Sequence, residues 1–150
     1  MREASSEGSI LLDNVLGYWI SRAHQALRAE MYRVFSTHGC ELTPEQWLVL
    51  VRLWERDGVA QHELAEATLR DRPTVSRILD GLEARALVER RLDPDDGRGR
   101  RIHLTAAGKK LRAKLRPLAA DIVERAIAGI SESDLRVMRR TLMRICANII

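Results

Sequence analysis

Residues 63–108 read ELAEATLRDRPTVSRILDGLEARALVERRLDPDDGRGRRIHLTAAG, and this stretch determines the expected fold. Residues 61–69 form a short helical segment in which Leu64 and Ala65 face inward. The next segment, residues 72–85, carries apolar side chains at helical spacing on one face: Val75, Ile78, Leu79 and Leu82. Two short helices separated by a tight turn predict a helix-turn-helix.

A basic hairpin follows these two helices. Residues 87–92 and 100–104 are short strand-like segments joined by a loop of Pro, Asp and Gly, which predicts a two-stranded wing. From Gly97 to Arg116 the chain carries eight Lys or Arg and no Asp or Glu. A helix followed by a basic hairpin can contact a groove and the flanking backbone of one DNA duplex together.

Helical segments flank this lobe on both sides. Residues 1–9 are polar and small, and we expect a flexible N-terminal tail there. The remaining chain divides into an N-terminal helix for dimerisation (10–42), a winged helix-turn-helix lobe (43–105) and C-terminal helices for dimerisation (106–150). The expected fold class is therefore mainly α with a small two- or three-stranded β-wing.

The terminal helices carry apolar stripes that a single chain leaves unpartnered. Apolar residues recur three or four positions apart from Leu12 to Phe35 and again from Leu135 to Ile149. Packing against a second copy would bury them. A two-fold dimer would present two recognition helices about one duplex turn apart, roughly 34 Å.

Composition narrows the class of protein. The chain has 150 residues, 45% of them apolar, and a formal net charge of +4 that is concentrated in one region. Its two cysteines, Cys40 and Cys146, lie far apart without metal-site spacing, which favours a reducing compartment. No apolar run reaches the length of a membrane span. We expect a soluble cytoplasmic protein with no membrane partner.

The stretch 63–108 resembles the MarR (multiple antibiotic resistance regulator) family. The matching pieces are ELA, then TVSR, a leucine-rich helix end, a DP-D-x-R wing and a closing LT-x-x-G. Members of this family are typically homodimeric winged-helix transcriptional regulators, usually repressors of pseudo-palindromic operators. Many release DNA when a small phenolic ligand binds or a thiol is oxidised. The resemblance implies the same function for this chain.

The resemblance also assigns roles to individual residues. By the motif match, we expect contacts with double-stranded DNA from Thr74, Ser76 and Arg77 of the helix and from Arg98 of the wing. We expect the nearby Arg72 and Arg100 to contact the DNA as well. Asp96 would support the wing by orienting Arg98. Arg100 and Arg101 are neighbours on a strand and point to opposite faces, so at most one faces the duplex. Arg77 is placed to contact either a guanine edge or a phosphate.

Two residues depart from the family pattern. Gly97 stands where a second basic residue is common, which weakens the expected contact of the wing. Ala86 stands where a glycine usually ends the recognition helix, so a left-handed turn retained there would be strained.

An effector site is implied where the first, second and fifth helices meet. Trp19, Arg22 and Trp47 are the candidate contacts for a small aromatic anion, although tryptophans on apolar stripes more often belong to the core.

The alternative function is a zinc or thiol-redox sensor on the same scaffold. It would use His38 and Cys40, although their spacing guarantees only two ligands. The sequence offers no phosphate-binding glycine loop, nucleophile elbow or HExxH motif, so we expect neither an enzyme, nor a cofactor, nor a catalytic metal.

Overall fold

The computed structural model of the chain describes residues 15–68 and 70–150. Its elements in chain order are α1 (Leu16–Thr37), α2 (Pro44–Glu55), β1 (Val59–Ala60), α3 (Gln61–Thr68), α4 (Arg72–Ala84), β2 (Val88–Asp93), β3 (Asp96–Leu104), α5 (Ala106–Ala126) and α6 (Glu132–Ile149). The expected tail of residues 1–9 and the expected helix start at Leu12 lie outside the described residues. The fold is mainly α with a small antiparallel sheet, as the sequence predicts.

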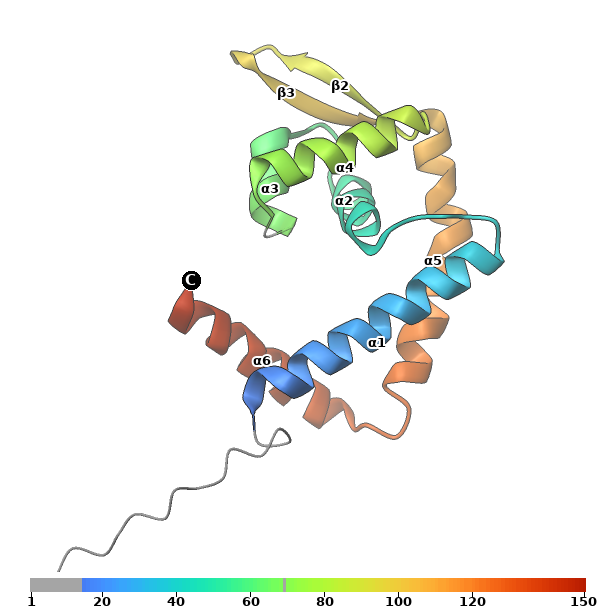
Figure 1. The fold of residues 1–150 in the computed structure, drawn as a ribbon, viewed down its shortest axis with the longest axis vertical. Helices are drawn as coiled ribbons and strands as arrows, with labels where there is room; N and C mark the ends of the chain where they lie inside the picture. The colour runs from blue at the N-terminus through green and yellow to red at the C-terminus, as the bar shows by residue number, and fades with distance from the viewer. Residues whose placement is uncertain (1–14, 69) are drawn as a thin grey trace, which may run out of the picture.

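The elements form an upper lobe and a lower helical layer (Figure 1). Helices α2, α3 and α4 and the β2–β3 hairpin make the lobe, and α5 runs downward from the hairpin. Helices α1 and α6 lie below the lobe. None of the helices within the described ranges is both long enough and apolar enough to cross a membrane.

Side-chain caps fix where the helices of the lobe begin. Thr43 and Gln46 form a capping box at the start of α2: the Thr43 hydroxyl accepts from the Gln46 N–H, and the Gln46 side chain accepts from the Thr43 N–H, both at 3.1 Å. Thr105 caps α5 by accepting from the Gly108 N–H at 3.1 Å. These caps set the phase in which each helix presents its apolar face to the core.

The sheet has three strands in the order β1–β3–β2, all antiparallel. Val88 pairs with Leu104, and Arg90 pairs with Ile102, so these side chains lie on one face of the hairpin. β1 adds only two residues and pairs Val59 with Ile102. Its pairing anchors β3, and through it the hairpin, to the chain that leads into α3.

One continuous core joins the lobe to the upper ends of α1 and α5. Its largest fully buried side chains include Phe35, Leu50, Leu79, Ile102 and Leu115. Trp47 and Trp54 pack against this core with their rings in edge contact, 5.5 Å between centroids. Burial of this core fixes α4 and the hairpin relative to each other.

The connection from α4 to β2 contains the expected departure. Ala86 has φ 56°, a left-handed conformation. The Leu87 N–H donates to the Leu82 carbonyl at 3.0 Å and the Ala86 N–H to the Glu83 carbonyl at 2.9 Å, which is a Schellman helix end. The turn usually made by glycine is therefore kept, with alanine in it.

Candidate nucleic-acid interface

Asp71 starts α4. Its Oδ1 accepts the Thr74 N–H at 2.7 Å, and this bond lowers the pKa of the Asp71 carboxyl below its ordinary value. A cap of this kind satisfies one of the unpaired N–H groups in the first helical turn. It fixes which side chains of α4 lie beside buried Val75 and Leu79 and which face outward.

The predicted DNA contacts on α4 fall on two sides of the helix. Arg72 and Ser76, four residues apart, face the hairpin. Thr74 and Arg77 face the other side, beside Gln46 of α2, where Arg77 Nη2 donates to Thr74 Oγ1 at 3.4 Å. The structure therefore places these four residues along two edges of the exposed surface of one helix.

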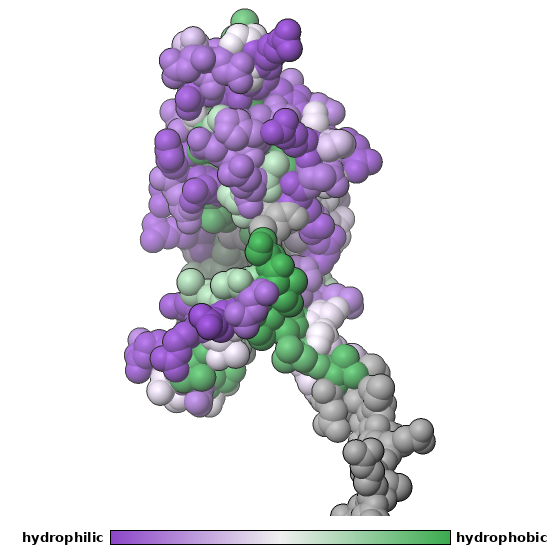
Figure 2. Space-filling model, turned by 90° about the vertical axis from the view of Figure 1, so that its left-hand side faces the viewer, coloured by the Kyte–Doolittle hydropathy of each residue, from purple (hydrophilic) through white to green (hydrophobic). Residues whose placement is uncertain are grey.

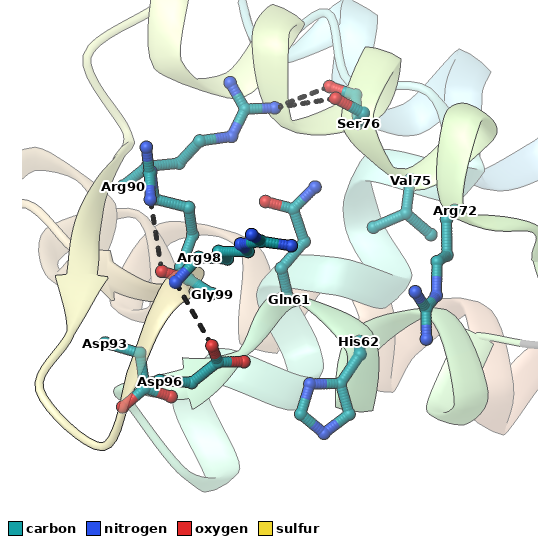
Figure 3. Close-up of a pocket in the computed structure, with 11 residues that line it drawn as sticks. Gln61, His62, Arg72, Val75, Ser76, Arg90, Asp93, Asp96, Arg98 and Gly99 are labelled. Atoms are coloured by element: carbon teal, nitrogen blue, oxygen red, sulfur yellow. Dashed lines mark hydrogen bonds between the residues drawn. The ribbon is translucent and has the colours of Figure 1, made fainter.

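A hollow of about 600 Å³ separates α4 from the hairpin, and we call it the wing hollow (Figure 3). Its lining comes from α3, α4, β2 and β3: Gln61, His62, Arg72, Val75, Ser76, Arg90, Asp93, Asp96, Arg98, Gly99 and Arg100. The structure thus brings Arg72 and Ser76 of the helix to the same hollow as Arg98 and Arg100 of the wing.

The turn of the hairpin lies earlier than the sequence pattern indicates. Strand β3 already begins at Asp96, which pairs with Asp93, and the tip is therefore Pro94–Asp95. The expected loop of Pro, Asp and Gly between Leu92 and Arg100 is wrong in this respect. Three residues, 97–99, are extra on β3 between the Asp93–Asp96 and Leu92–Arg100 pairs, so Arg98 lies in a bulge beside the strand and not at the tip.

Buried Asp93 holds the turn. Its Oδ1 accepts the Asp95 N–H at 3.0 Å and lies 3.2 Å from Arg101 Nε, and these two interactions lower the pKa of its carboxyl. Arg101 also donates to the Gly58 carbonyl at 2.9 Å. Arg101 is thus engaged on the face of the strand opposite Arg100, in agreement with the alternation expected from the sequence.

Asp96 supports the bulge through the backbone. Its Oδ1 accepts the Arg98 N–H at 3.1 Å, and a Cβ on Gly99 would lie 3.0 Å from Asp96 Oδ2. The carboxylate therefore folds over residues 98 and 99, which leaves the Arg98 guanidinium directed elsewhere. Glycine at position 99 leaves the space that this carboxylate occupies.

The arginines of this surface divide into two groups. Arg90, Arg91 and Arg101 each lie within 4 Å of a carboxylate. By contrast, none of the ion pairs formed within residues 15–68 and 70–150 involves the four predicted DNA-contacting arginines: Arg72, Arg77, Arg98 and Arg100. All four are exposed. Their charges are therefore available to an external polyanion.

Sequence reasoning missed Arg90, Asp93, Gln61 and His62 as parts of this surface. The signal for Arg90 was present, because it lies two residues after buried Val88 and therefore points to the inner face of the strand. Gln61 and His62 carried no comparable signal. They reach the hollow because β1 pairs with β3 and places the start of α3 beside the wing.

Comparison with known proteins now identifies the family. The sequence model of the MarR family matches residues 42–99. The uncharacterized HTH-type transcriptional regulator YybA of Bacillus subtilis is 30% identical over 109 residues, which cover 73% of this chain and 73% of YybA. The chain belongs to the MarR family. It is accordingly a DNA-binding transcriptional regulator and not an enzyme.

Solved MarR-type structures agree in fold. The Staphylococcus aureus MepR–DNA complex has a TM-score of 0.80 and 25% identity, covering 89% of this chain and 98% of MepR. CouR of Rhodococcus jostii RHA1, bound to p-coumaroyl-CoA, has a TM-score of 0.79 and 28% identity, covering 91% of this chain and 95% of CouR. The similarity to both extends over lobe and flanking helices.

A second hollow, of about 580 Å³, lies between α2 and α5, and we call it the helix hollow. Its lining includes Trp47, Trp54, Arg112 and Arg116. Of the three predicted effector contacts, the structure brings Trp47 to this hollow but not Trp19 or Arg22. Trp19 is 53% exposed on α1, with the Arg22 guanidinium 6.0 Å from its ring centroid. Arg112 and Arg116 belong to the run of eight basic residues noted in the sequence, but the sequence did not assign either of them to an effector site.

The described residues do not support the zinc or thiol-redox alternative in this MarR-family chain. Across residues 15–68 and 70–150, no group of three or more His, Cys, Asp or Glu could hold a metal ion. Cys40 is buried in the core, and the His38 ring bonds the Val34 carbonyl at 2.8 Å. Cysteines buried in apolar surroundings are generally unreactive.

Proposed function

We propose that this MarR-family chain is a homodimeric, ligand-responsive repressor that binds a pseudo-palindromic operator. Each protomer would insert α4 into a major groove and lay the bulged side of the wing on the adjoining minor groove. DNA backbone between the two grooves would pass along the wing hollow. The exposed arginines of helix and wing would then neutralise phosphates on both sides of that strand.

The single observation that carries this proposal is the separation of paired from unpaired arginines. Arg90 and Arg101, which have carboxylate partners, brace the wing, whereas the exposed arginines of α4 and β3 form no ion pair within the described residues. If these arginines served only solubility, pairing them with nearby acids would stabilise the folded protein. Four exposed guanidinium groups that form no ion pair within the described residues instead suit a polyanionic partner.

The dimer is proposed from the faces that one chain leaves uncovered. None of the residues of α6 is buried, and Met143 and Ile149 are 67% and 80% exposed. On α1, Leu16 is 64% exposed. Figure 2 shows hydrophobic residues gathered on the lower part of the molecule, below a largely hydrophilic upper lobe. A second copy of the chain would bury these stripes, as soluble homo-oligomers commonly do.

Selection of random duplexes by the purified protein tests the DNA function. We expect recovery of an inverted repeat with half-site centres about 10 bp apart, because a two-fold dimer places its recognition helices one turn apart. Binding should weaken steeply with added salt. Recovery of no preferred sequence, or of single half-sites by a monomer, would contradict the proposal.

The helix hollow is the proposed effector site. Trp47 and Trp54 offer aromatic faces, Arg112 and Arg116 offer cationic groups, and Glu55 and Glu124 offer acceptors at the same hollow. A hydroxyaryl carboxylate matches this set, with its carboxylate at an arginine and its hydroxyl donating to a glutamate. The p-coumaroyl-CoA bound to CouR also carries a hydroxyaryl group.

An occupant of this hollow would act on the spacing of the two lobes. Trp54 Nε1 donates to the Gly108 carbonyl at 2.9 Å, which ties α2 to the first turn of α5. A ligand that separates α2 from α5 changes how the lobe sits on the dimerising helices. If it binds better to a spacing that does not fit the operator, it shifts the population away from DNA.

Tryptophan fluorescence of a Trp19→Phe variant tests the effector site, because Trp47 and Trp54 then supply the signal. We expect saturable quenching by 4-hydroxybenzoate and much weaker quenching by uncharged 4-hydroxybenzyl alcohol. Arg116→Gln should weaken binding of the acid, whereas Arg136→Gln on α6 should not. Equal binding of acid and alcohol would contradict the assigned role of the arginines.

A further inference from the structure

Arg90 connects the wing to three positions on α4, of which Figure 3 shows the contact with Ser76. Its Nη2 donates to the Ser76 carbonyl at 2.7 Å, and its Nη1 donates to Asp80 Oδ1 at 2.7 Å. Its backbone N–H donates to Glu83 Oε2 at 3.1 Å. Residues 76, 80 and 83 lie on one face of a helix, so a single β2 residue contacts about two turns of α4.

The position of Arg90 is not that of a surface ion pair. Its side chain is only 17% exposed, and its Nε is buried without an acceptor among the residues that the structure describes. Burying an unpaired donor costs free energy, so the residue is not optimised for stability alone. A rigid guanidinium fork that bonds a carbonyl and a carboxylate in two directions instead specifies a geometry.

This geometry concerns the residues that border the wing hollow. Arg90 pairs with Ile102 on the neighbouring strand. Two residues closer to the tip of the hairpin, on the same face of the sheet, Leu92 pairs with Arg100. The bulge that carries Arg98 follows immediately beyond that pair. Fixing β2 at Arg90 therefore fixes where Arg98 and Arg100 stand relative to Ser76 and Arg72 on the facing helix.

We propose that Arg90 is a positioning residue for DNA recognition, which sets the separation and angle between α4 and the wing so that one backbone strand fits between them. This inference rests on the proposed function and goes beyond it, because Arg90 itself need not touch DNA. Without the contacts of Arg90 with α4, the wing remains attached through the sheet, but the positions of its arginines relative to α4 are no longer fixed.

A double-mutant cycle between Arg90 and Arg98 tests the inference with the selected operator and full-length dimer. In the wild-type background, Arg98→Ala should weaken binding about tenfold, the size of a good phosphate or groove contact. In the Arg90→Met background, Arg98→Ala should have little further effect, because a displaced wing no longer delivers Arg98 to its groove. A positioning role thus predicts strong coupling between two residues that share no hydrogen bond or ion pair in the described part of the chain.

Two matched variants separate positioning from charge and from folding. Arg91→Met removes the same charge from the next residue, which pairs with Glu89 on the opposite face, and its effect should add to that of Arg98→Ala. Arg90→Lys keeps the charge but lacks the fork, and should behave as Arg90→Met does. If Arg90→Met does not fold, Asp80→Ala with Glu83→Ala removes two partners whose side chains are 62% and 44% exposed.

Each outcome of the cycle has a distinct meaning. Strong coupling with Arg90 and additivity with Arg91, in variants with wild-type circular dichroism, support the inference. Equal losses on Arg98→Ala in the wild-type and Arg90→Met backgrounds overturn it while leaving the proposed function intact. A wild-type protein that binds no duplex at all refutes the proposed function, and the role of Arg90 falls with it.

Discussion

Glu30 of α1 and Arg125 of α5 are joined by a hydrogen bond of 2.9 Å between Oε1 and Nη2. Arg33 also donates to both oxygens of Glu30, at 2.8 and 2.7 Å, and Asp121 accepts from Arg125 Nε at 2.9 Å. These four residues connect the proposed dimerisation helix to the helix that descends from the wing. The connection is ionic, so its strength depends on pH.

Glu30→Gln should therefore destabilise the protein in a pH-dependent manner. Hydrogen bonds from Arg33 and then from Arg125 lower the pKa of Glu30 from 4.5 to about 2. A carboxyl whose folded pKa is depressed contributes stability above its ordinary pKa and loses that contribution as pH falls through its folded value. The melting temperature of Glu30→Gln should lie below wild type at pH 7, and the difference should shrink between pH 4.5 and pH 2.

The control for this variant is Glu66→Gln, an exposed glutamate on α3 outside the network. Its melting temperature should follow that of wild type throughout the same pH range. A gap between Glu30→Gln and wild type that stayed constant down to pH 2 would show that the loss comes from packing and not from charge.

Ala86→Gly should stabilise the protein. Alanine in a left-handed conformation costs about 1–2 kcal/mol, and glycine removes this strain while adding about 0.4–1 kcal/mol of unfolded-state entropy. The net gain in the free energy of unfolding should be about 0.5–1 kcal/mol, measured by urea denaturation. Ala113→Gly, in the exposed middle of α5, should instead lose about 1 kcal/mol. A lower free energy of unfolding for Ala86→Gly than for wild type would mean that alanine at φ 56° is not strained.

Gly108→Ala should be strongly destabilising for a different reason. A Cβ there would lie 2.1 Å from the Leu87 carbonyl oxygen, which is backbone and cannot rotate away. The start of α5 would have to move from the end of α4, at a cost of about 1–3 kcal/mol. Gly97→Ala is the matched control, because its Cβ would meet nothing within 4 Å. Equal unfolding midpoints for the two variants would disprove the close approach.

The sequence predicted those parts of the fold that local chemistry controls. Recognition helix α4 was expected at 72–85 and spans Arg72–Ala84, and Ala86, identified in the sequence as a departure from glycine, keeps the left-handed turn. These features depend on capping and helical spacing within a few residues. The early turn at Pro94–Asp95 was not predicted, because the bulge that carries Arg98 is held by Asp96 after the hairpin has formed.

The sites could be predicted less completely because they depend on which elements converge. Helical spacing placed Trp19 and Trp47 on apolar stripes, but it could not show that only Trp47 of the two lines the helix hollow. In the wing hollow, Arg98 was identified from the family motif, whereas Arg90 was identified only from the structure. The Arg90 side chain became interpretable only when its partners on α4 were known.

Arg77 and Arg98 should contribute to DNA binding in different ways. Arg77→Ala should relax the base preference at one position of the selected site, because a guanidinium on the exposed side of α4 can bond a guanine edge in the major groove. Arg98→Ala should weaken binding most on A·T-rich flanks, where a narrow minor groove has an enhanced negative potential. If either guanidinium instead neutralises a phosphate, its substitution should lower the slope of log K against log salt concentration by about one.

Competition binding with a panel of duplexes that vary one position at a time measures both effects. Arg91→Ala serves as the control, since Arg91 lies on the wing but pairs with Glu89 on the other face. It should change neither the base preference nor the flank preference. If Arg77→Ala and Arg98→Ala both weakened binding uniformly across the panel, each arginine would be a phosphate contact, and sequence recognition would have to come from Thr74, Ser76 or the shape of the DNA.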